Sequence, residues 1–214
     1  VASPRLAAPL EGDLVSAETV IDASRLRPGW VILTMGTRPD ALGAAVRSAR
    51  SQTTTGPVHV VAQGTDAVLP EGAVAVRLPA NLGIPGGRDR GLSSIDADVV
   101  FFLDDDARYV DDEVAAAVLH RMAADPGLAA VSLRVVDDAG STLQRHVPRI
   151  GRRGASRSGP VTSFLGGACA LRRDAYLAVG GYHGDFFYGH EEMDLAWRLL
   201  DAGYRIEYLA RPAV

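Results

Sequence analysis

Three adjacent carboxylates follow directly on an apolar run in this sequence. Asp104, Asp105 and Asp106 come immediately after DVVFFL (98–103), whose composition is typical of a buried strand. Carboxylates held so close together repel one another unless a cation neutralises them. Along an extended chain, Asp104 and Asp106 point to one side and Asp105 to the other. The pattern favours a Mg²⁺ or Mn²⁺ site with room for the phosphates of a substrate, and the alternative is an acidic turn that faces solvent.

A second acidic cluster opens a predicted helix in HEEMDLAWRLLDAGY (190–204). Glu191 and Glu192 stand in its first turn, where the helix dipole favours acids without any function. Asp194 lies four residues before Arg198, which is the spacing of an ordinary helical ion pair. Glycines and aromatic residues crowd the approach in GGYHGDFFYGH, and a Gly-Gly pair further upstream lets backbone come close to a ligand. Taken alone, this cluster fits a structural role as well as a functional one.

Composition limits the classes of protein to which the chain can belong. Its 214 residues, 47% hydrophobic and 22% charged, suit one well-packed domain. The net charge of −4 argues against a nucleic-acid partner, and no apolar run approaches the ~18 residues of a transmembrane segment. A single cysteine, Cys169, excludes an internal disulfide and favours a reducing compartment. We therefore expect a cytoplasmic protein, either free or peripheral at the inner face of the membrane.

Lysine is absent, and all 22 basic residues are arginine. This excludes a Schiff-base lysine, a phosphate-loop lysine and an Asp–Lys phosphotransfer pair. Whatever chemistry the acids perform, they perform it without lysine.

Strands alternate with helices along the chain, which predicts an α/β fold on a mostly parallel sheet with helices on its faces. Ligands of such sheets bind beyond the carboxyl ends of the strands, where the acidic triplet lies. We expect residues 1–29 to form an extension and 30–214 a single domain. Strands are expected at 30–35, 57–62, 72–79, 98–103, 128–136, 161–173 and 205–210, and helices at 39–51, 111–124, before 180 and at 190–204. The segment 81–95 is expected to start as a glycine-rich loop and to pass into a helix.

Two further expectations concern the second half of the chain. In the 190–204 helix, the predicted core stripe consists of Met193, Ala196, Trp197 and Leu200. The segment 148–160 carries four arginines among glycines and polar residues, and it is expected to be a long flexible loop. Within it, 149–157 either orders over a phosphate-bearing donor or an anionic acceptor, or remains a solvated loop.

Several segments together resemble glycosyltransferase family 2, the inverting enzymes with the Rossmann-like GT-A fold. They are NLGIPGGRDRGL, FFLDDDA, SFLGGACALRRDAY and VGGYHGDFFYGHEEMDLAWRLLDAGYRIEYLARPAV. The resemblance covers about residues 30–214 in the expected order. It is closest to the bacterial branch that adds rhamnose-like or galactofuranose-like sugars.

The resemblance implies transfer of a sugar from a nucleoside-diphosphate-sugar to an acceptor hydroxyl on a glycan, a lipid-linked molecule or a small molecule. Asp104 and Asp106 match the metal ligands, for Mn²⁺ or Mg²⁺, and Asp105 matches a contact to the nucleotide sugar. The metal stabilises the charge that develops on the leaving diphosphate. Glu192 matches the general base that takes the acceptor's proton, with Glu191 and Asp194 as rivals.

Other positions match segments that line the donor. Arg88 could pair with diphosphate oxygens, although an exposed charge at a helix start is the ordinary alternative. The matching donor-binding positions are Thr34, Gly36, Arg38, Arg88, Gly166, Gly167 and His190, of which His190 could equally be a helix cap.

The sequence departs from the family's pattern at two places. Ala62 stands where family members often carry an Asp that contacts the nucleoside, and Gln63 replaces an Asn; Asp66 could compensate. A histidine metal ligand usually follows a segment like ARPAV, and this sequence ends there at Val214.

These departures motivate an alternative of another class, a catalytically inactive relative that binds a nucleotide-sugar or a partner. A phosphotransferase of the haloacid-dehalogenase type would use Asp104 and Asp106, but DDDARY and the absence of lysine argue against it. A nucleotidyltransferase would need a basic phosphate-gripping loop near the first strand, where only Arg38 is available.

Overall fold

The sheet is built outward from β1 (Pro28–Thr34), a strand with no exposed residue, which lies between two parallel neighbours, β2 (Val58–Gln63) and β4 (Val99–Asp104). The computed structural model describes residues 26–148 and 152–214, and these form one α/β domain around an eight-stranded mixed sheet. The strand order is β3-β2-β1-β4-β7-β5-β8-β6. The remaining strands are β3 (Val74–Leu78), β5 (Leu128–Arg134), β6 (Gly159–Pro160), β7 (Ala168–Arg172) and β8 (Arg205–Ala213).

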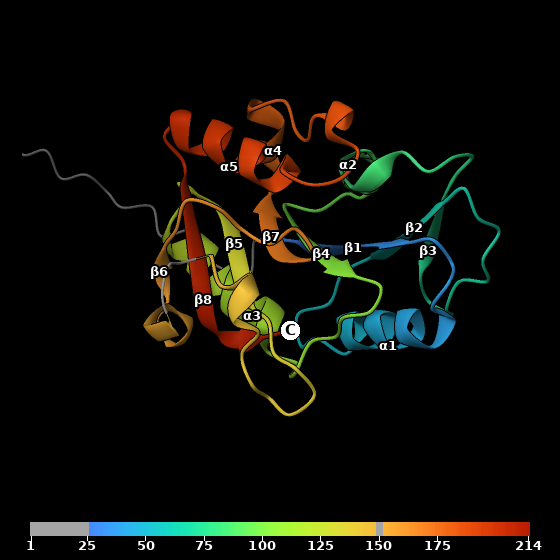
Figure 1. Ribbon diagram of the computed structural model, residues 1–214, viewed down its shortest axis with the longest axis horizontal. Helices are drawn as coiled ribbons and strands as arrows, with labels where there is room; N and C mark the ends of the chain where they lie inside the picture. Colours follow the sequence, from blue (N-terminus) through green and yellow to red (C-terminus); the bar gives the residue numbers. More distant parts are fainter. Residues whose placement is uncertain (1–25, 149–151) are drawn as a thin grey trace, which may run out of the picture.

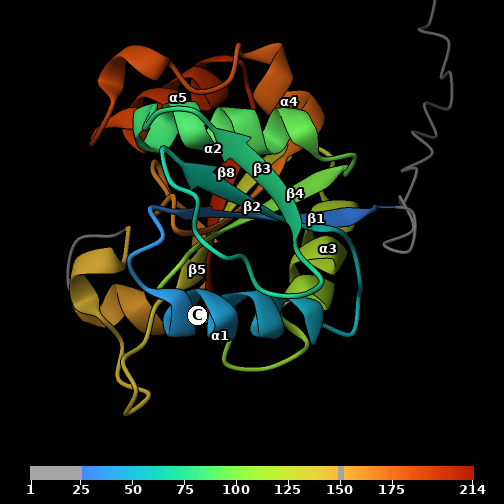
Figure 2. The ribbon, with the colours of Figure 1, turned by 90° about the vertical axis from the view of Figure 1, so that its right-hand side faces the viewer.

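Helices cover both faces of this sheet, which explains why its central strands are apolar on both sides (Figure 1). On one face lie α1 (Pro39–Arg50) and α3 (Val114–Ala124); on the other lie α2 (Gly83–Ser94), α4 (Arg173–Ala178) and α5 (Glu191–Asp201) (Figure 2). The side chains of β4 alternate between the two cores. Phe101 stacks on Trp30 with ring centroids 5.3 Å apart, whereas Phe102 meets Tyr182 on the opposite face.

Strand direction places the acidic triplet at the carboxyl edge of the parallel strands. β1, β2, β3 and β4 are parallel, so their carboxyl ends meet at one edge, and β7 runs antiparallel between β4 and β5. β7 therefore begins at the edge where β4 ends, and the Asp104 N–H donates to the Gly167 carbonyl at 3.1 Å. The loops after β1, β2 and β4 and the start of β7 can contribute side chains to one site.

The predicted fold class is confirmed, with small shifts in the elements. β1 begins at Pro28, inside the expected extension, and α3 begins at Val114, after three acidic residues outside the helix. The strand expected over 161–173 is shorter, because only Ala168–Arg172 pairs as β7. Among the described residues, no helix combines the length and the apolar character needed to cross a membrane.

The core stripe predicted for α5 was wrong for Met193 and Trp197, whereas Ala196 is buried as predicted and Leu200 packs partly buried against the core. Met193 and Trp197 are 42% and 57% exposed, whereas Leu195, Ala196 and Leu199 are buried together with Glu191. The helix is turned so that Glu191 faces inward, where its carboxylate lies 3.7 Å from the Arg88 guanidinium. Hydrophobicity alone could not show this, because the inward stripe begins with a charged residue.

The segment 148–160 is not one continuous irregular loop in its described part. It contains a 3-10 helix (Arg152–Ser156) and the strand β6, which pairs with β8. Tyr208 donates its hydroxyl to the Ala155 carbonyl at 3.0 Å, and the Ser158 hydroxyl accepts from the Ala210 N–H. Residues 149–151 lie outside the described part, and the expected ordering over a ligand stays a prediction.

Candidate active site

The three aspartates at the end of β4 do not alternate as an extended chain would. The Ala107 N–H donates to the Asp104 carbonyl at 3.1 Å, so the chain turns after Asp104. Asp105 is buried and accepts a hydrogen bond of 2.7 Å from the Thr34 hydroxyl. Asp105 and Asp106 both contact Arg38, while Asp104 faces Arg88. The predicted separation of Asp105 from the other two was therefore wrong, because the turn replaces the extended backbone on which it depended.

Arg88 joins the two acidic clusters of the sequence. Its side chain is 4% exposed, and the Nη1 group donates to Glu192 Oε1 at 2.9 Å while Nη2 lies 3.5 Å from Asp104 Oδ1. Its guanidinium also lies 6.0 Å from the centre of the Phe102 ring. A buried arginine stays charged, so these carboxylates offset the cost of its burial. The alternative of an exposed helix-start charge is excluded by this burial.

The Gly-Gly pair before β7 makes room for this arrangement. A Cβ at Gly167 would collide with the Asp104 carboxylate, and a Cβ at Gly166 would collide with Arg88 and with Glu192. The two glycines thus let charged side chains from β4, α2 and α5 meet. They are packed against these residues, and they are not among the residues that line the adjacent pocket.

The cluster of aspartates and glutamates around Arg88 carries excess negative charge. Solvent reaches half of the Asp104 side chain, but the protein atoms packed around its carboxyl raise its pKa by desolvation. The charges of Asp106, Asp105 and Glu192 raise this pKa further, against the lowering by Arg88. Burial likewise raises the pKa of Glu191, and its Oε2 atom has no hydrogen-bond partner among the described residues.

The three candidate bases differ in accessibility. Glu191 is buried, with only 2% of its side chain exposed. Asp194 is 25% exposed, but it accepts two hydrogen bonds from Arg198, at 3.0 and 2.6 Å, which is the helical ion pair expected from their spacing. Glu192 has 22% of its side chain exposed and is held by Arg88, which lines the pocket. None of the three candidate bases is itself among the residues that line the pocket.

A pocket of about 310 Å³ lies beside the cluster at the carboxyl edge of the sheet. Among the expected site residues, it brings together Thr34, Arg38, Arg88 and the three aspartates. The other lining residues are Leu33, Met35, Gln63, Asn81, Gly83, Ile84, Phe187 and Tyr188.

Several of these lining residues were missed as site residues. Gln63 could have been found, since it ends β2 as Asp104 ends β4. Phe187 and Tyr188 belong to the aromatic segment before α5, and the Phe187 carbonyl accepts from the Ile84 N–H at 2.8 Å. That contact between distant segments sets the aromatic residues at the pocket, and nothing in the sequence signalled it.

Besides Gly166 and Gly167, three expected donor-binding residues do not line this pocket. Asp66 lines a separate hollow with Arg77 and Pro79, so the geometry gives no support to its compensating for Ala62. The Gly36 N–H donates to the Thr34 hydroxyl, a supporting contact behind the pocket wall. His190 is exposed and precedes α5 with a left-handed backbone (φ 69°).

The residues present fit a divalent metal that is shared with a substrate. No group of three or more acidic, histidine or cysteine side chains converges as a metal cage in the part of the chain that the structure describes. Asp104 and Asp106 nevertheless open to the pocket with about half of each side chain exposed. Mg²⁺ is commonly held by one or two carboxylates together with substrate phosphates and water, which is the complement these residues offer.

Solved structures share this fold at low sequence identity. GalNAc-T7, crystallised with UDP, GalNAc and Mn²⁺, superposes with a TM-score of 0.69 at 13% identity over 88% of this chain and 43% of that one. The mannosyltransferase PcManGT from Pyrobaculum calidifontis, in complex with GDP-Man and Mn²⁺, gives 0.65 at 20% identity over 88% and 58%. S. aureus TarS 1-349 gives 0.65 at 13% identity over 88% and 59%. The chain therefore spans 43 to 59% of the length of these proteins.

Sequence comparison gives the family directly. Curated proteins give no match to this sequence. Residues 150–212 match the family described as the N-terminal domain of galactosyltransferase. Residues 30–180, more than half of the chain, match glycosyl transferase family 2, and the chain belongs to that family.

Proposed function

We propose that this protein is a metal-dependent inverting glycosyltransferase, which moves a sugar from a nucleoside-diphosphate-sugar to an acceptor hydroxyl. One observation carries the proposal. The buried Arg88, which lines the pocket, joins the Asp104 carboxylate at the end of β4 to the Glu192 carboxylate at the start of α5, nearly 90 residues further along the chain.

Asp104 and Asp106 are the proposed ligands of Mn²⁺ or Mg²⁺, because both open to the pocket with hard oxygen ligands. When bound, the metal neutralises negative charge on the departing nucleoside diphosphate. Asp105 is assigned to the nucleotide side, because its oxygens are already engaged by Thr34 and Arg38.

Glu192 is the proposed general base. Its side chain is 22% exposed, against 2% for Glu191, and Arg88 holds its carboxylate in place at 2.9 Å. Asp194 is occupied by Arg198, and Glu191 lacks access to a substrate. In an inverting transfer, Glu192 removes the proton of the acceptor hydroxyl while that oxygen attacks the anomeric carbon from the face opposite the leaving group.

The donor is proposed to be a nucleoside-diphosphate-sugar whose nucleotide lies against Thr34, Gln63 and Asp105. Two of the similar solved structures hold such nucleotides, UDP in one and GDP-Man in the other, each with Mn²⁺. Two finer points stay predictions. One is the acceptor, which is a glycan, a lipid-linked molecule or a small molecule, and the other is the rhamnose-like or galactofuranose-like branch of the family.

A thermal-shift panel tests the proposal. We expect one of UDP, GDP, dTDP, CDP or ADP to raise the melting temperature by several degrees in the presence of Mn²⁺, with a smaller rise in EDTA, because a ligand that binds only the folded state stabilises it. The corresponding nucleotide-sugar should then be hydrolysed slowly with Mn²⁺, and Asp106→Asn should abolish this hydrolysis. Nucleotide binding without turnover of any donor would instead favour the inactive binding module.

A further inference from the structure

Arg38 holds two aspartates of the triplet with one side chain. Its Nη2 group lies 2.8 Å from Asp105 Oδ1, and its Nη1 group contacts Asp106 Oδ2. Arg38 stands in the turn between β1 and α1, directly across from the end of β4. A guanidinium suits this bridging position, because its planar fork presents two donors side by side.

Arg38 and the proposed metal ion would both bind Asp106. Asp106 is a proposed metal ligand, and the carboxylate oxygen that binds Arg38 is not free to bind an ion at the same time. Asp104, the other proposed ligand, faces a different arginine, Arg88.

The two arginines differ in freedom of movement. Arg88 is 4% exposed and is enclosed by α5 and the Gly-Gly pair, whereas the Arg38 side chain is 52% exposed at the mouth of the pocket. Ion pairs between groups as exposed as Arg38 and Asp106 contribute only about 0–1 kcal/mol, so they exchange partners readily. Arg38 can therefore leave Asp106, and Arg88 is fixed.

We propose that Arg38 is a built-in counter-cation of the acidic triplet, which competes with the divalent metal for Asp106 and moves to the diphosphate of the donor when that ligand arrives. This inference rests on the function proposed above and adds an order of events to it. The metal alone binds weakly, because it must displace a guanidinium. The metal and the nucleoside diphosphate bind cooperatively, because the diphosphate offers Arg38 a new anionic partner in the same pocket.

Direct titration with MnCl₂, following free Mn²⁺ by electron paramagnetic resonance, tests the competition without any turnover. We expect Arg38→Gln to bind Mn²⁺ about fivefold more tightly than the wild-type protein, the change that corresponds to releasing an exposed ion pair worth ~1 kcal/mol. Arg38→Lys keeps the charge but loses the two-pronged bridge, so it should bind Mn²⁺ with intermediate affinity. Arg108→Gln is the matched control, since it removes the same charge two residues from Asp106, from an exposed pair with Asp138.

Repeating the titration with the nucleoside diphosphate selected by the thermal-shift panel tests the coupling. The nucleotide should increase Mn²⁺ affinity several-fold more in the wild-type protein than in Arg38→Gln. Thermal unfolding of each variant checks that it is folded, and Arg38→Lys carries the test if Arg38→Gln does not fold.

Four results would overturn the inference. They are unchanged or weaker Mn²⁺ binding by Arg38→Gln, an equal gain in Arg108→Gln, wild-type affinity in Arg38→Lys, and equal nucleotide coupling in the wild-type protein and Arg38→Gln. Each of these leaves the proposed function standing as long as the wild-type protein binds metal and nucleotide. Failure of the wild-type protein to bind either one would remove the proposed function and this inference together.

Discussion

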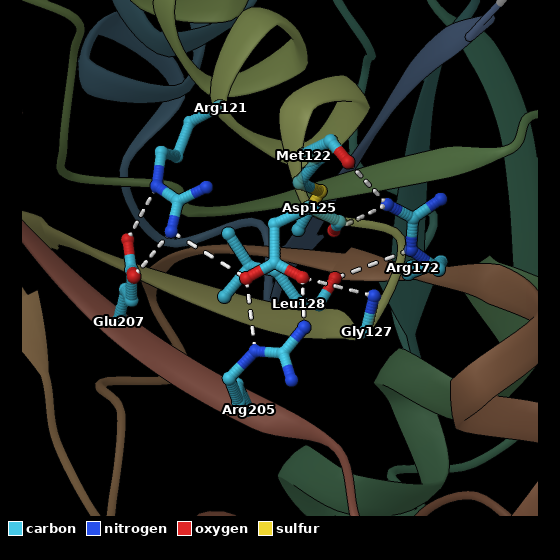
Figure 3. A network of polar contacts seen from close by, with 8 residues as sticks. All are labelled: Arg121, Met122, Asp125, Gly127, Leu128, Arg172, Arg205 and Glu207. Carbon is cyan, nitrogen blue, oxygen red and sulfur yellow. Dashed lines mark hydrogen bonds and ion pairs between the residues drawn. The ribbon is translucent and has the colours of Figure 1, made fainter. Parts of the chain in front are cut away.

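Two clusters of arginines and carboxylates lie at opposite edges of the same sheet, and they differ in charge balance. The site cluster, at the carboxyl edge, consists of Asp104, Asp105, Asp106, Glu191 and Glu192 with Arg38 and Arg88. The edge cluster, at the amino ends of β5 and β8, consists of Asp125 and Glu207 with Arg121, Arg172 and Arg205 (Figure 3).

In the edge cluster, every charged group has matched partners. Asp125 accepts from Arg205 Nε at 2.9 Å and from the Gly127 N–H at 3.1 Å, and Glu207 accepts two hydrogen bonds from Arg121. Arg172 is buried and donates to the Met122 and Leu128 carbonyls, at 2.7 and 3.2 Å (Figure 3). These contacts tie the end of α3 to three strands of the sheet.

The site cluster contains five acids and two arginines, whereas the edge cluster contains two acids and three arginines. The pKa shifts reflect this difference. Hydrogen bonds from Arg205 lower the pKa of Asp125, whereas desolvation and neighbouring acids raise that of Asp104. A cluster in which every charged group has partners within the protein is complete without a ligand and can serve stability. An acidic excess at a pocket is costly until a cation arrives, and this separates a site from a structural network although both are built from the same residue types.

The largest expected difference between the clusters is catalytic. Glu192→Gln should lower the rate of sugar transfer by about 10²–10⁴-fold, because a positioned general base contributes that much. Glu207→Gln, the same change in the edge cluster, should leave the rate within about twofold at a temperature where the protein is folded. Initial rates and nucleotide affinity measured on both variants check this. Equal losses in the two variants would mean that Glu192 acts only through the fold.

A smaller catalytic effect is expected from Gly167→Ala. The added methyl group would occupy the place of the Asp104 carboxylate and displace it from the pocket, and a displacement of about 1 Å can cost about 10²-fold in rate. The variant's rate and its Mn²⁺ affinity should fall together. Gly184→Ala is the control, because an added Cβ there meets nothing within 4 Å. Gly140 also has open space around it, but its left-handed backbone would itself be strained by alanine. A Gly167→Ala variant with normal metal affinity would contradict this role.

The comparison reverses for stability. Asp125→Asn should lower the free energy of unfolding by about 1–3 kcal/mol, since it weakens charge-assisted hydrogen bonds to two arginines. Asp104→Asn should leave that free energy unchanged or raise it, because it removes one charge from an acidic excess. Denaturant unfolding of both variants measures the difference. Equal losses of unfolding free energy in the two variants would contradict this difference between the clusters.

The sequence predicted the backbone of the site better than its side-chain contacts. The strand before Asp104 and the helix that begins with the acids of α5 could be predicted, because strand ends and first helical turns are local features. Arg38 and Arg88 were expected to meet a donor, but in this structure their partners are carboxylates. Those pairings depend on how β1, β4 and α5 approach one another, and the same packing turns Glu191 inward and leaves Trp197 exposed. Local periodicity carries no information about such contacts.

The smallest expected effect concerns pH. Arg205 lowers the pKa of Asp125 in the folded protein below the ~3.9 of an unfolded aspartate, so its charged form contributes stability above that value. This contribution is lost as the pH falls through the folded-state pKa. The difference in unfolding free energy between the wild-type protein and Asp125→Asn should therefore be full near pH 6 and should shrink as the pH approaches 3. Asp138→Asn, whose carboxylate is 90% exposed, should show little difference at either pH. A constant gap for Asp125→Asn would mean that packing, and not its charge, stabilises the edge cluster.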